Sequence, residues 1–181
     1  SEDGSLVDAD ARIESSWEAG GFGRSVSCEG DTDLDGLPDL LVGAPDTDPG
    51  HAFLYQQTLE GVVEANSADG VVEGTKEGGY SFGKSVSLEA DMDGDDLYDV
   101  VIGSGYMDAV YLFYGGISGT VGISSADVSF EAAVEDDYPS TVAGCPDMDG
   151  DGIDDLLIGG ENESTNGLFA GAAYLILGGG G

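Results

Sequence analysis

The chain has few positively charged side chains. Four lysines and arginines stand against 37 aspartates and glutamates, which gives a formal net charge of −33 over 181 residues. Proteins bind nucleic acid and anionic lipid by neutralising phosphate groups with lysine and arginine. The composition therefore excludes both as expected partners, and it favours cations.

Histidine and long apolar runs are also scarce. The single histidine, His51, cannot build a histidine-based metal site, and the sequence contains no H-E-x-x-H pattern. We therefore expect no enzymatic activity. No apolar run approaches the roughly 18 residues of a membrane-spanning helix, and no basic and apolar leader stands at Ser1. We expect a soluble chain without membrane insertion, from which any export signal has been removed or was never included.

Glycine and short apolar runs are abundant. The chain has 32 glycines, and hydrophobic residues make up 40% of it. Runs of valine, leucine, isoleucine and tyrosine alternate with segments rich in glycine and aspartate. This pattern is typical of many short β-strands joined by tight turns, and the apolar content is too high for a disordered acidic tail. The predicted fold class is all-β.

Three segments of the chain repeat one pattern. They read DTDLDGLPDLLVGAP from Asp31, DMDGDDLYDVVIGSG from Asp91 and DMDGDGIDDLLIGG from Asp147, at spacings of 60 and then 56 residues. A related lead-in precedes each segment and an apolar segment follows it; the lead-ins begin at Gly21, Tyr80 and Asp137, and the apolar segments at His51, Ala109 and Ala172. We expect repeats over approximately residues 18–76, 77–134 and 135–181, in a single module of residues 1–181.

A further element has the pattern Ala-Asp-x-x-apolar-Glu. It occurs at residues 68–73 and 126–131, between successive repeats, and at residues 9–14, ahead of the first repeat. The third repeat runs to YLILGGGG without a copy of it. We expect four strands per repeat, with a closing strand at residues 5–16 that completes the last one.

Aspartates occupy positions 1, 3, 5 and 9 of each repeated loop. Oxygen ligands at alternating positions wrap a tight loop around a hard cation; Ca²⁺ accepts about six to eight of them, whereas Mg²⁺ demands a stricter octahedron. The alternative is an acidic turn without metal, but four carboxylates on one loop would then repel one another. We predict three calcium sites, each completed by a backbone carbonyl at position 7. The predicted ligands are Asp31, Asp33, Asp35, Leu37 and Asp39; Asp91, Asp93, Asp95, Leu97 and Asp99; and Asp147, Asp149, Asp151, Ile153 and Asp155.

An EF-hand loop also begins D-x-D-x-D-G, but it needs a glutamate at position 12 and helices on both sides. Position 12 holds a β-branched residue in every loop: Val42, Ile102 and Ile158. The EF-hand is therefore excluded. Position 6, where we expect a positive φ, is Gly36 in the first loop and Gly152 in the third. Asp96 is a poorer occupant of that position, so we expect the middle loop to be more strained.

These features resemble the FG-GAP repeat of integrin alpha subunits, which many secreted bacterial proteins also carry. The first repeat has Phe22-Gly23, the calcium loop and Gly43-Ala44-Pro45. The second keeps Phe82-Gly83 but has GSG after the loop, and the third has Tyr138-Pro139 and GGE. The resemblance covers about residues 9–178. It implies a β-propeller with one four-stranded blade per repeat and calcium bound in a loop at one rim.

The number of blades leads to a hypothesis of self-assembly. Propellers close with typically four to eight blades, and three blades alone would expose sheet edges that invite association. We hypothesise that the strand at residues 5–16 completes the third blade of a neighbouring copy, which gives either a closed ring of two copies or an open filament. Closure within one chain, or excision from a longer propeller, is the alternative.

The two cysteines, Cys28 and Cys145, each stand just ahead of a calcium loop. In an assembly of copies they would lie on adjoining blades, where a disulfide could join one copy to the next. The interpretation that we favour is two free thiols, because lying on adjoining blades does not ensure the Cα separation below about 7 Å that a disulfide needs.

A secreted adhesion module is the alternative function. Integrin-like propellers recognise ligands through rim loops, and residues 44–51 and 160–171 are long and polar. They are candidates for binding a protein or a glycan, or else plain solvated turns, and Asn162 opens an N-x-S sequon. Extracellular modules bind Ca²⁺ with a Kd of about 10⁻⁴ to 10⁻³ M, which cytosolic calcium does not reach. We therefore expect an extracellular or cell-surface location.

Overall fold

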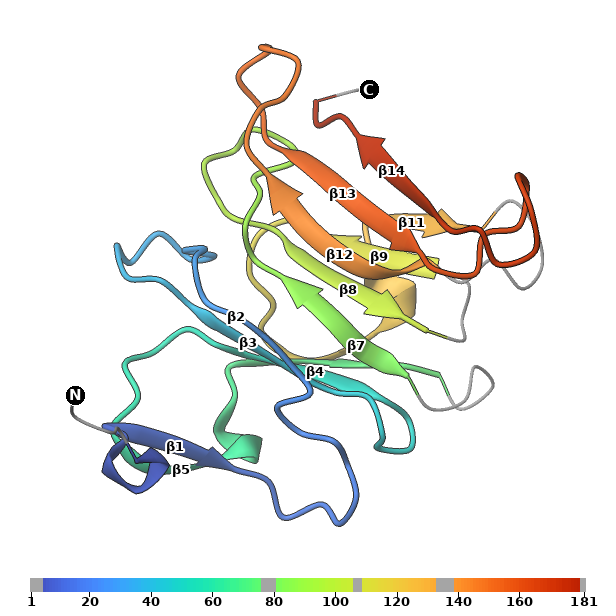
Figure 1. The fold of residues 1–181 in the computed structure, drawn as a ribbon. Helices are drawn as coiled ribbons and strands as arrows, with labels where there is room; N and C mark the ends of the chain where they lie inside the picture. The colour runs from blue at the N-terminus through green and yellow to red at the C-terminus, as the bar shows by residue number, and fades with distance from the viewer. Residues whose placement is uncertain (1–4, 76–80, 106–108, 133–138, 180–181) are drawn as a thin grey trace.

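The computed structural model describes residues 5–75, 81–105, 109–132 and 139–179 (Figure 1). The strands are β1 (Ala11–Glu14), β2 (Ser25–Ser27), β3 (Leu40–Ala44), β4 (His51–Tyr55), β5 (Gly61–Glu64), β6 (Gly70–Glu73), β7 (Phe82–Ser87), β8 (Val100–Ser104), β9 (Ala109–Phe113), β10 (Gly119–Gly122), β11 (Val128–Glu131), β12 (Pro139–Cys145), β13 (Asp155–Gly160) and β14 (Ala172–Ile176). Short 3-10 helices are η1 (Leu6–Asp8), η2 (Ala65–Ser67) and η4 (Ile123–Ser125). The described part of the chain contains no helix of the length and apolarity that a membrane span requires.

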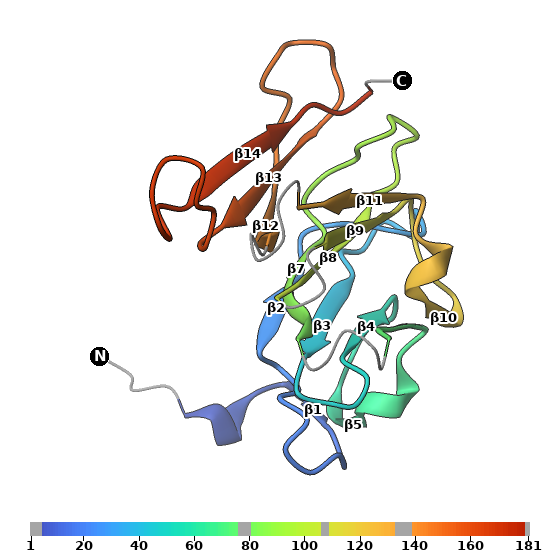
Figure 2. The ribbon, with the colours of Figure 1, turned by 90° about the vertical axis from the view of Figure 1, so that its right-hand side faces the viewer.

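The strands form three main sheets, which we call sheets 1 to 3. Sheet 1 has the strand order β10-β6-β4-β3-β2, sheet 2 the order β11-β9-β8-β7 and sheet 3 the order β12-β13-β14. Neighbouring strands are antiparallel, except that β10 runs parallel to β6. The sheets follow one another side by side, so that β1 lies near sheet 1 and β14 lies at the opposite end of the molecule (Figures 1 and 2). The predicted all-β fold is confirmed.

Apolar side chains fill the spaces between successive sheets. Leu41 and Leu54 of sheet 1 pack with Phe82 of sheet 2, and Val101 and Leu112 of sheet 2 pack with side chains of sheet 3. The central strands β3, β4, β8 and β9 are therefore covered on both faces, which explains why their sequences are continuous apolar runs instead of alternating ones.

The four strands predicted for a repeat lie side by side in sheet 1, in the order β6-β4-β3-β2, and they make up the whole of sheet 2. Sheet 1 gains a fifth strand, β10, which belongs to the second repeat in sequence, and sheet 3 has three strands within the described residues. Sequence reasoning missed β5 and β10, since both are short, contain glycine and pair only with strands far away in the chain. Each begins at a glycine with positive φ, Gly61 at 66° and Gly119 at 70°.

The N-terminal strand β1 lies outside the three sheets. It pairs parallel with β5, in the register Ala11 to Gly61 through Glu14 to Glu64. Its Ile13 packs against a buried cluster of sheet 1 that includes Phe53. Within this chain, β1 therefore does not complete sheet 3, and its use by a neighbouring copy stays a prediction.

Candidate calcium sites

Each aspartate-rich loop connects the first two strands of a sheet: β2 to β3, β7 to β8 and β12 to β13. The same hydrogen bond closes all three loops, because the position-1 carboxylate accepts the N–H of position 6. This bond joins Asp31 to Gly36 at 2.9 Å, Asp91 to Asp96 at 2.8 Å and Asp147 to Gly152 at 2.8 Å. Local sequence thus builds one loop three times.

Carboxylate oxygens converge in every loop. One oxygen from each of three aspartates lies within 4.8 Å of the other two in the groups Asp31, Asp33 and Asp39; Asp91, Asp93 and Asp99; and Asp147, Asp149 and Asp151. Three hard anionic oxygens this close together are the donor set that suits Ca²⁺. The chemistry of the residues therefore fits the predicted metal.

The remaining predicted ligands lie in the same loops but outside these groups. Asp35 and Asp95 each accept the N–H of position 7, from Leu37 at 2.7 Å and from Leu97 at 2.9 Å. In the third loop the aspartate outside the group is Asp155, whereas Asp151, a member of the group, accepts the N–H of Ile153 at 2.9 Å. These bonds orient the position-7 peptides, whose carbonyls we predict as ligands. The full set of five ligands per loop stays a prediction.

The aspartate at position 9 has a second role that sequence reasoning missed. Asp39, Asp99 and Asp155 are buried, and each accepts the N–H of position 2 at 2.7 Å, from Thr32, Met92 and Met148. Asp99 also accepts the N–H of Gly115 at 2.8 Å, and Asp155 that of Gly178 at 3.0 Å. In sheets 2 and 3 this residue therefore ties the loop to the chain that follows the third strand of the sheet. Its position at the start of the apolar run is the one sequence signal of this burial.

The electrostatics of the loops favour a bound cation. Burial raises the pKa of Asp99 to about 7, against the lowering effect of the N–H groups of Gly115 and Met92. Burial likewise raises the pKa of Asp39. At position 1 of the third loop, by contrast, the backbone N–H groups of Gly150 and Gly152 lower the pKa of Asp147. A buried carboxylate beside other carboxylates is costly to ionise, and a divalent cation would remove that cost.

The backbone of the loops is left-handed at two positions, not one. Position 6 has the expected positive φ, at 85° for Gly36, 72° for Asp96 and 94° for Gly152. Position 4 has it as well, at 61° for Leu34, 80° for Gly94 and 88° for Gly150. The expectation that the middle loop is the more strained one overlooked the first loop, which holds a leucine in a conformation that favours glycine. Glycine at position 4 of the other two loops was the available signal.

The predicted rim loops meet at the other end of the sheets. The loop between β3 and β4 and the loop between β13 and β14 both line a cavity of about 670 Å³, through Pro45 and Asp46 and through Glu161 and Asn162. Arg24 and Lys84 line the same cavity, and the Lys84 Nζ lies 3.5 Å from Glu161 Oε1. Because strands of an antiparallel sheet alternate in direction, this end lies opposite the calcium loops.

Features that could suggest catalysis have structural explanations. His51 is buried, its Nδ1 lies 2.6 Å from Thr47 Oγ1, and burial lowers its pKa. Residues 78–85, GGYSFGKS, fit the spacing of a phosphate-binding loop, but a phosphate-binding loop opens a helix and the described second half is strand β7. Cys28 and Cys145 form no disulfide with each other within this chain, and a disulfide between copies stays untested.

Comparison with known proteins agrees with the loop geometry. A family model described as FG-GAP repeat matches residues 138–176. Human integrin alpha-7 is 42% identical over 92 residues, which cover 51% of this chain and 8% of that protein. This chain is integrin alpha-like and carries an FG-GAP repeat. Drosophila melanogaster integrin alpha-PS5 is 35% identical over 95 residues, and Gallus gallus integrin alpha-6 is 33% identical over 92 residues. These matches cover 51% of this chain in both cases, with 10% of the first protein and 8% of the second.

This similarity bears on the fold, on the acidic loops and on the function. The FG-GAP match spans the strands of sheet 3 and implies that this sheet is a propeller blade. The three aspartate groups are consistent with calcium sites of FG-GAP repeats. The matched FG-GAP and integrin alpha homologues are a non-enzymatic family, in agreement with the expectation of no enzymatic activity. The similarity gives no support to a filament, and it favours the adhesion alternative.

Proposed function

We propose that the chain is a calcium-stabilised, extracellular binding module of an adhesion protein. The observation that carries this proposal is that the two ends of the sheets differ in chemistry. Three similar acidic loops lie at one end, and a cavity lined by residues of all three sheets lies at the other. The similarity to integrin alpha chains supports the adhesive role and the extracellular location.

In this proposal each loop binds one Ca²⁺ through the carboxylates at positions 1, 3, 5 and 9 and the carbonyl at position 7. Three divalent ions would change the formal charge from −33 to −27. At a calcium concentration about ten times Kd, each site would stabilise the fold by roughly 1.4 kcal/mol. Sites with a Kd of about 10⁻⁴ to 10⁻³ M fill outside cells and not in the cytosol.

The cavity at the opposite end is the proposed ligand site. It holds two of the four basic residues of the chain, Arg24 and Lys84, which come from sheets 1 and 2. Arg24 and Lys84 balance the two acidic residues of the same lining, Asp46 and Glu161, so that the cavity lacks the excess negative charge of the rest of the chain and can accept a ligand with an acidic group. The ligand is a protein or a glycan with a carboxylate or sulfate that these two side chains contact.

The test is binding to an array of matrix glycoproteins and acidic glycans, with calcium and with chelator. We expect calcium-dependent binding that Arg24→Ala and Lys84→Ala each weaken about tenfold or more. Arg12→Ala is the control, since Arg12 pairs with Glu14 on β1 and does not line this cavity. Binding that both cavity variants leave unchanged, or no binding to any surface, would contradict the proposal.

Self-association is a second candidate function, and a different observation favours it. Sheet 3 has three strands within the described residues, and the apolar side chains of Leu175 in β14 and of Leu177 just after it are exposed. Exposed sheet edges pair readily with other strands. We propose that copies of the chain associate through such an edge, independently of ligand binding at the cavity.

A further inference from the structure

Sheet 3 exposes a face whose equivalent is buried in sheets 1 and 2. Leu157 of β13 and Leu175 of β14 are 39% and 47% exposed. Their counterparts in the repeats are all buried between sheets: Leu41 and Leu54 in sheet 1, and Val101 and Leu112 in sheet 2. Sheets 1 and 2 each use this face to contact the next sheet. Sheet 3 presents the same apolar face to solvent.

Sheet 1 has the complementary exposure on its opposite face. Val26 of β2 is 64% exposed, whereas its counterparts Val86 and Val142 are buried against the preceding sheet. Cys28 is exposed, whereas its counterpart Leu88 is fully buried against sheet 1. The two faces left exposed are therefore the two that meet at every junction between sheets in this chain.

The N-terminal element, η1 and β1, has the features of the fourth strands β6 and β11, but within the described part of the chain it lacks their antiparallel partner strand. A 3-10 helix precedes β1 as it precedes β6 and β11, in the pairs η1-β1, η2-β6 and η4-β11. The parallel partners also match, because β1 pairs with β5 as β6 pairs with β10. The entry bond is the same: Gly61 donates its N–H to the Asp10 carbonyl at 2.9 Å, and Gly119 to the Asp69 carbonyl at 2.8 Å.

The packing of β1 places it at the junction before sheet 1. Val72 of β6 packs against sheet 2 and Phe130 of β11 packs against sheet 3. Ile13, at the same position of β1, packs against sheet 1. β1 therefore occupies the place of a fourth strand of a sheet that precedes sheet 1, and its antiparallel edge has no strand partner among the described residues. Sheet 3 consists of the three strands that such a sheet would need in addition to β1, namely β12, β13 and β14.

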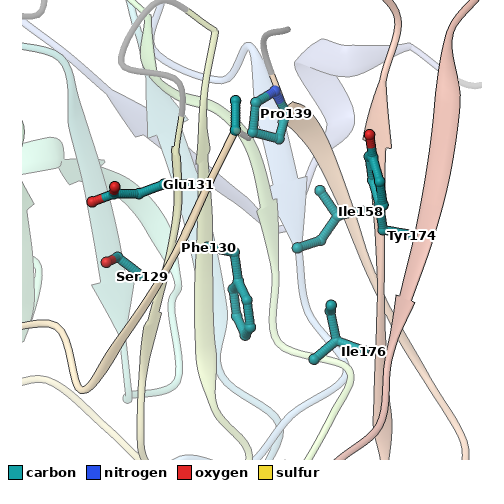
Figure 3. A pocket seen from close by; sticks show the side chains of 8 residues that line it. Ser129, Phe130, Glu131, Pro139, Ile158, Tyr174 and Ile176 are labelled. Carbon is teal, nitrogen blue, oxygen red and sulfur yellow. The ribbon is translucent and has the colours of Figure 1, made fainter. Parts of the chain in front are cut away.

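An apolar groove beside β14 matches the start of this element. It has a volume of about 370 Å³, and Phe130, Ile158 and Ile176 line it (Figure 3). At the equivalent junction of sheets 1 and 2, Ile123 of η4 packs against the core. The residue of η1 at the position of Ile123 is Leu6, which is 93% exposed. Leu6 is therefore an exposed apolar side chain without a site, and the groove is an apolar site at the junction that corresponds to the one where Ile123 packs.

We propose that copies of this chain associate head to tail, with residues 5–14 of one copy completing sheet 3 of another. β1 pairs antiparallel with β14, and the pairs of sheets 1 and 2 set the register: Ala11 opposite Leu175, Arg12 opposite Tyr174, Ile13 opposite Ala173 and Glu14 opposite Ala172. Leu6 enters the groove, and Val26 and Cys28 cover Leu157 and Leu175. This inference specifies the self-association proposed above and rests on it, and it does not involve the ligand cavity.

A second copy is the occupant because this chain itself carries every matching part. The motif, the 3-10 helix, the parallel pairing and the exposed faces all repeat features that already meet within the molecule. The same relation also places the cysteines. A Cβ built on Gly144 would lie 2.8 Å from Cβ of Glu89 across the junction of sheets 2 and 3. Cys28 has the same position in its repeat as Gly144, and Cys145 has the same position as Glu89. At the proposed junction between copies the two cysteines would therefore face each other as Gly144 and Glu89 do here.

The test uses these native thiols on the full chain, with calcium and oxidised glutathione. Two protein thiols and one glutathione disulfide yield one interchain disulfide and two reduced glutathione molecules. We expect the wild type to form covalent dimers or longer ladders on a non-reducing gel. Cys28→Ser and Cys145→Ser alone should each stay monomeric, and an equimolar mixture of the two should give a covalent dimer. Dimers of either single variant alone, or none from the mixture, would overturn the head-to-tail junction.

The strand register has its own test, in a background of Cys28→Ser and Cys145→Ser. Opposed residues of antiparallel strands have Cα atoms about 4.5 to 5.5 Å apart, which a disulfide can bridge. We expect Ala11→Cys with Leu175→Cys to crosslink between copies, and Arg12→Cys with Leu175→Cys, one residue out of register, to crosslink at least tenfold less.

Sedimentation without oxidant separates failure of the site from failure of self-association. Oligomers without either crosslink would overturn this junction and leave self-association in place. A monomer of 18.4 kDa throughout would overturn both, and would assign the groove to another segment or ligand.

Discussion

Sheets 2 and 3 carry the same acidic loop, but they differ in what covers their strands. In both, the position-9 aspartate is buried and accepts the N–H of position 2. Leu112 of sheet 2 is nevertheless buried against sheet 3, whereas Leu175, at the same place in sheet 3, is 47% exposed. The loop is set by about ten consecutive residues, and the burial of a strand is set by a neighbour elsewhere. Local chemistry and tertiary environment are therefore separable in this molecule.

Calcium removal should affect sheets 2 and 3 alike, because their loops are alike. With three sites, each contributing roughly 1.4 kcal/mol at ten times Kd, chelation should lower the free energy of unfolding by about 4 kcal/mol. Amide hydrogen exchange should show loss of protection in both β8 and β13. Loss confined to one sheet, or an unchanged urea midpoint, would break the equivalence of the loops.

Truncation of the paired leucines should separate the two sheets. Leu112→Ala removes a fully buried side chain and should cost about 2 to 5 kcal/mol. Leu175→Ala removes a half-exposed one and should cost less than about 1 kcal/mol in the monomer. Urea unfolding at low protein concentration measures both. Equal losses of unfolding free energy would show that Leu175 is covered in solution. If copies associate, the loss caused by Leu175→Ala should increase with protein concentration.

Leucine at position 4 of the first loop should give the smallest effect. Leu34→Gly removes the strain of a leucine in the left-handed conformation, which destabilises the folded state by about 1 to 2 kcal/mol. Glycine in turn destabilises the folded state by about 0.5 to 1 kcal/mol, because it loses more chain entropy on folding. We expect a net stabilisation of roughly 0.5 to 1 kcal/mol in calcium. Leu37→Gly, also exposed and in the same loop but without a positive φ, is the control and should not stabilise.

Much of the site could be predicted from sequence because it is local. The spacing of the aspartates identified all three carboxylate groups, and Gly36 and Gly152 identified one of the two left-handed positions. The structural role of Asp99 could not be read in this way, since it depends on the N–H of Gly115, which lies 16 residues further along the chain.

The fold was less predictable where pairing is not local. The period of the repeats indicated strands at the apolar segments, and those strands exist. β5 and β10 were missed because their parallel partners, β1 and β6, lie about 50 residues away and leave no mark in short sequences such as GTVG. The extra strand of sheet 1 is a consequence of that long-range pairing.

Calcium stoichiometry tests the central claim most directly. Equilibrium dialysis of the full chain against millimolar calcium should give three ions per chain. Asn substitutions at Asp31, Asp91 and Asp147, introduced one at a time, should each lower that number by one, and Asp46→Asn, at the cavity end, should leave it at three. Fewer than three ions for the wild type, or three ions retained after these substitutions, would contradict the account.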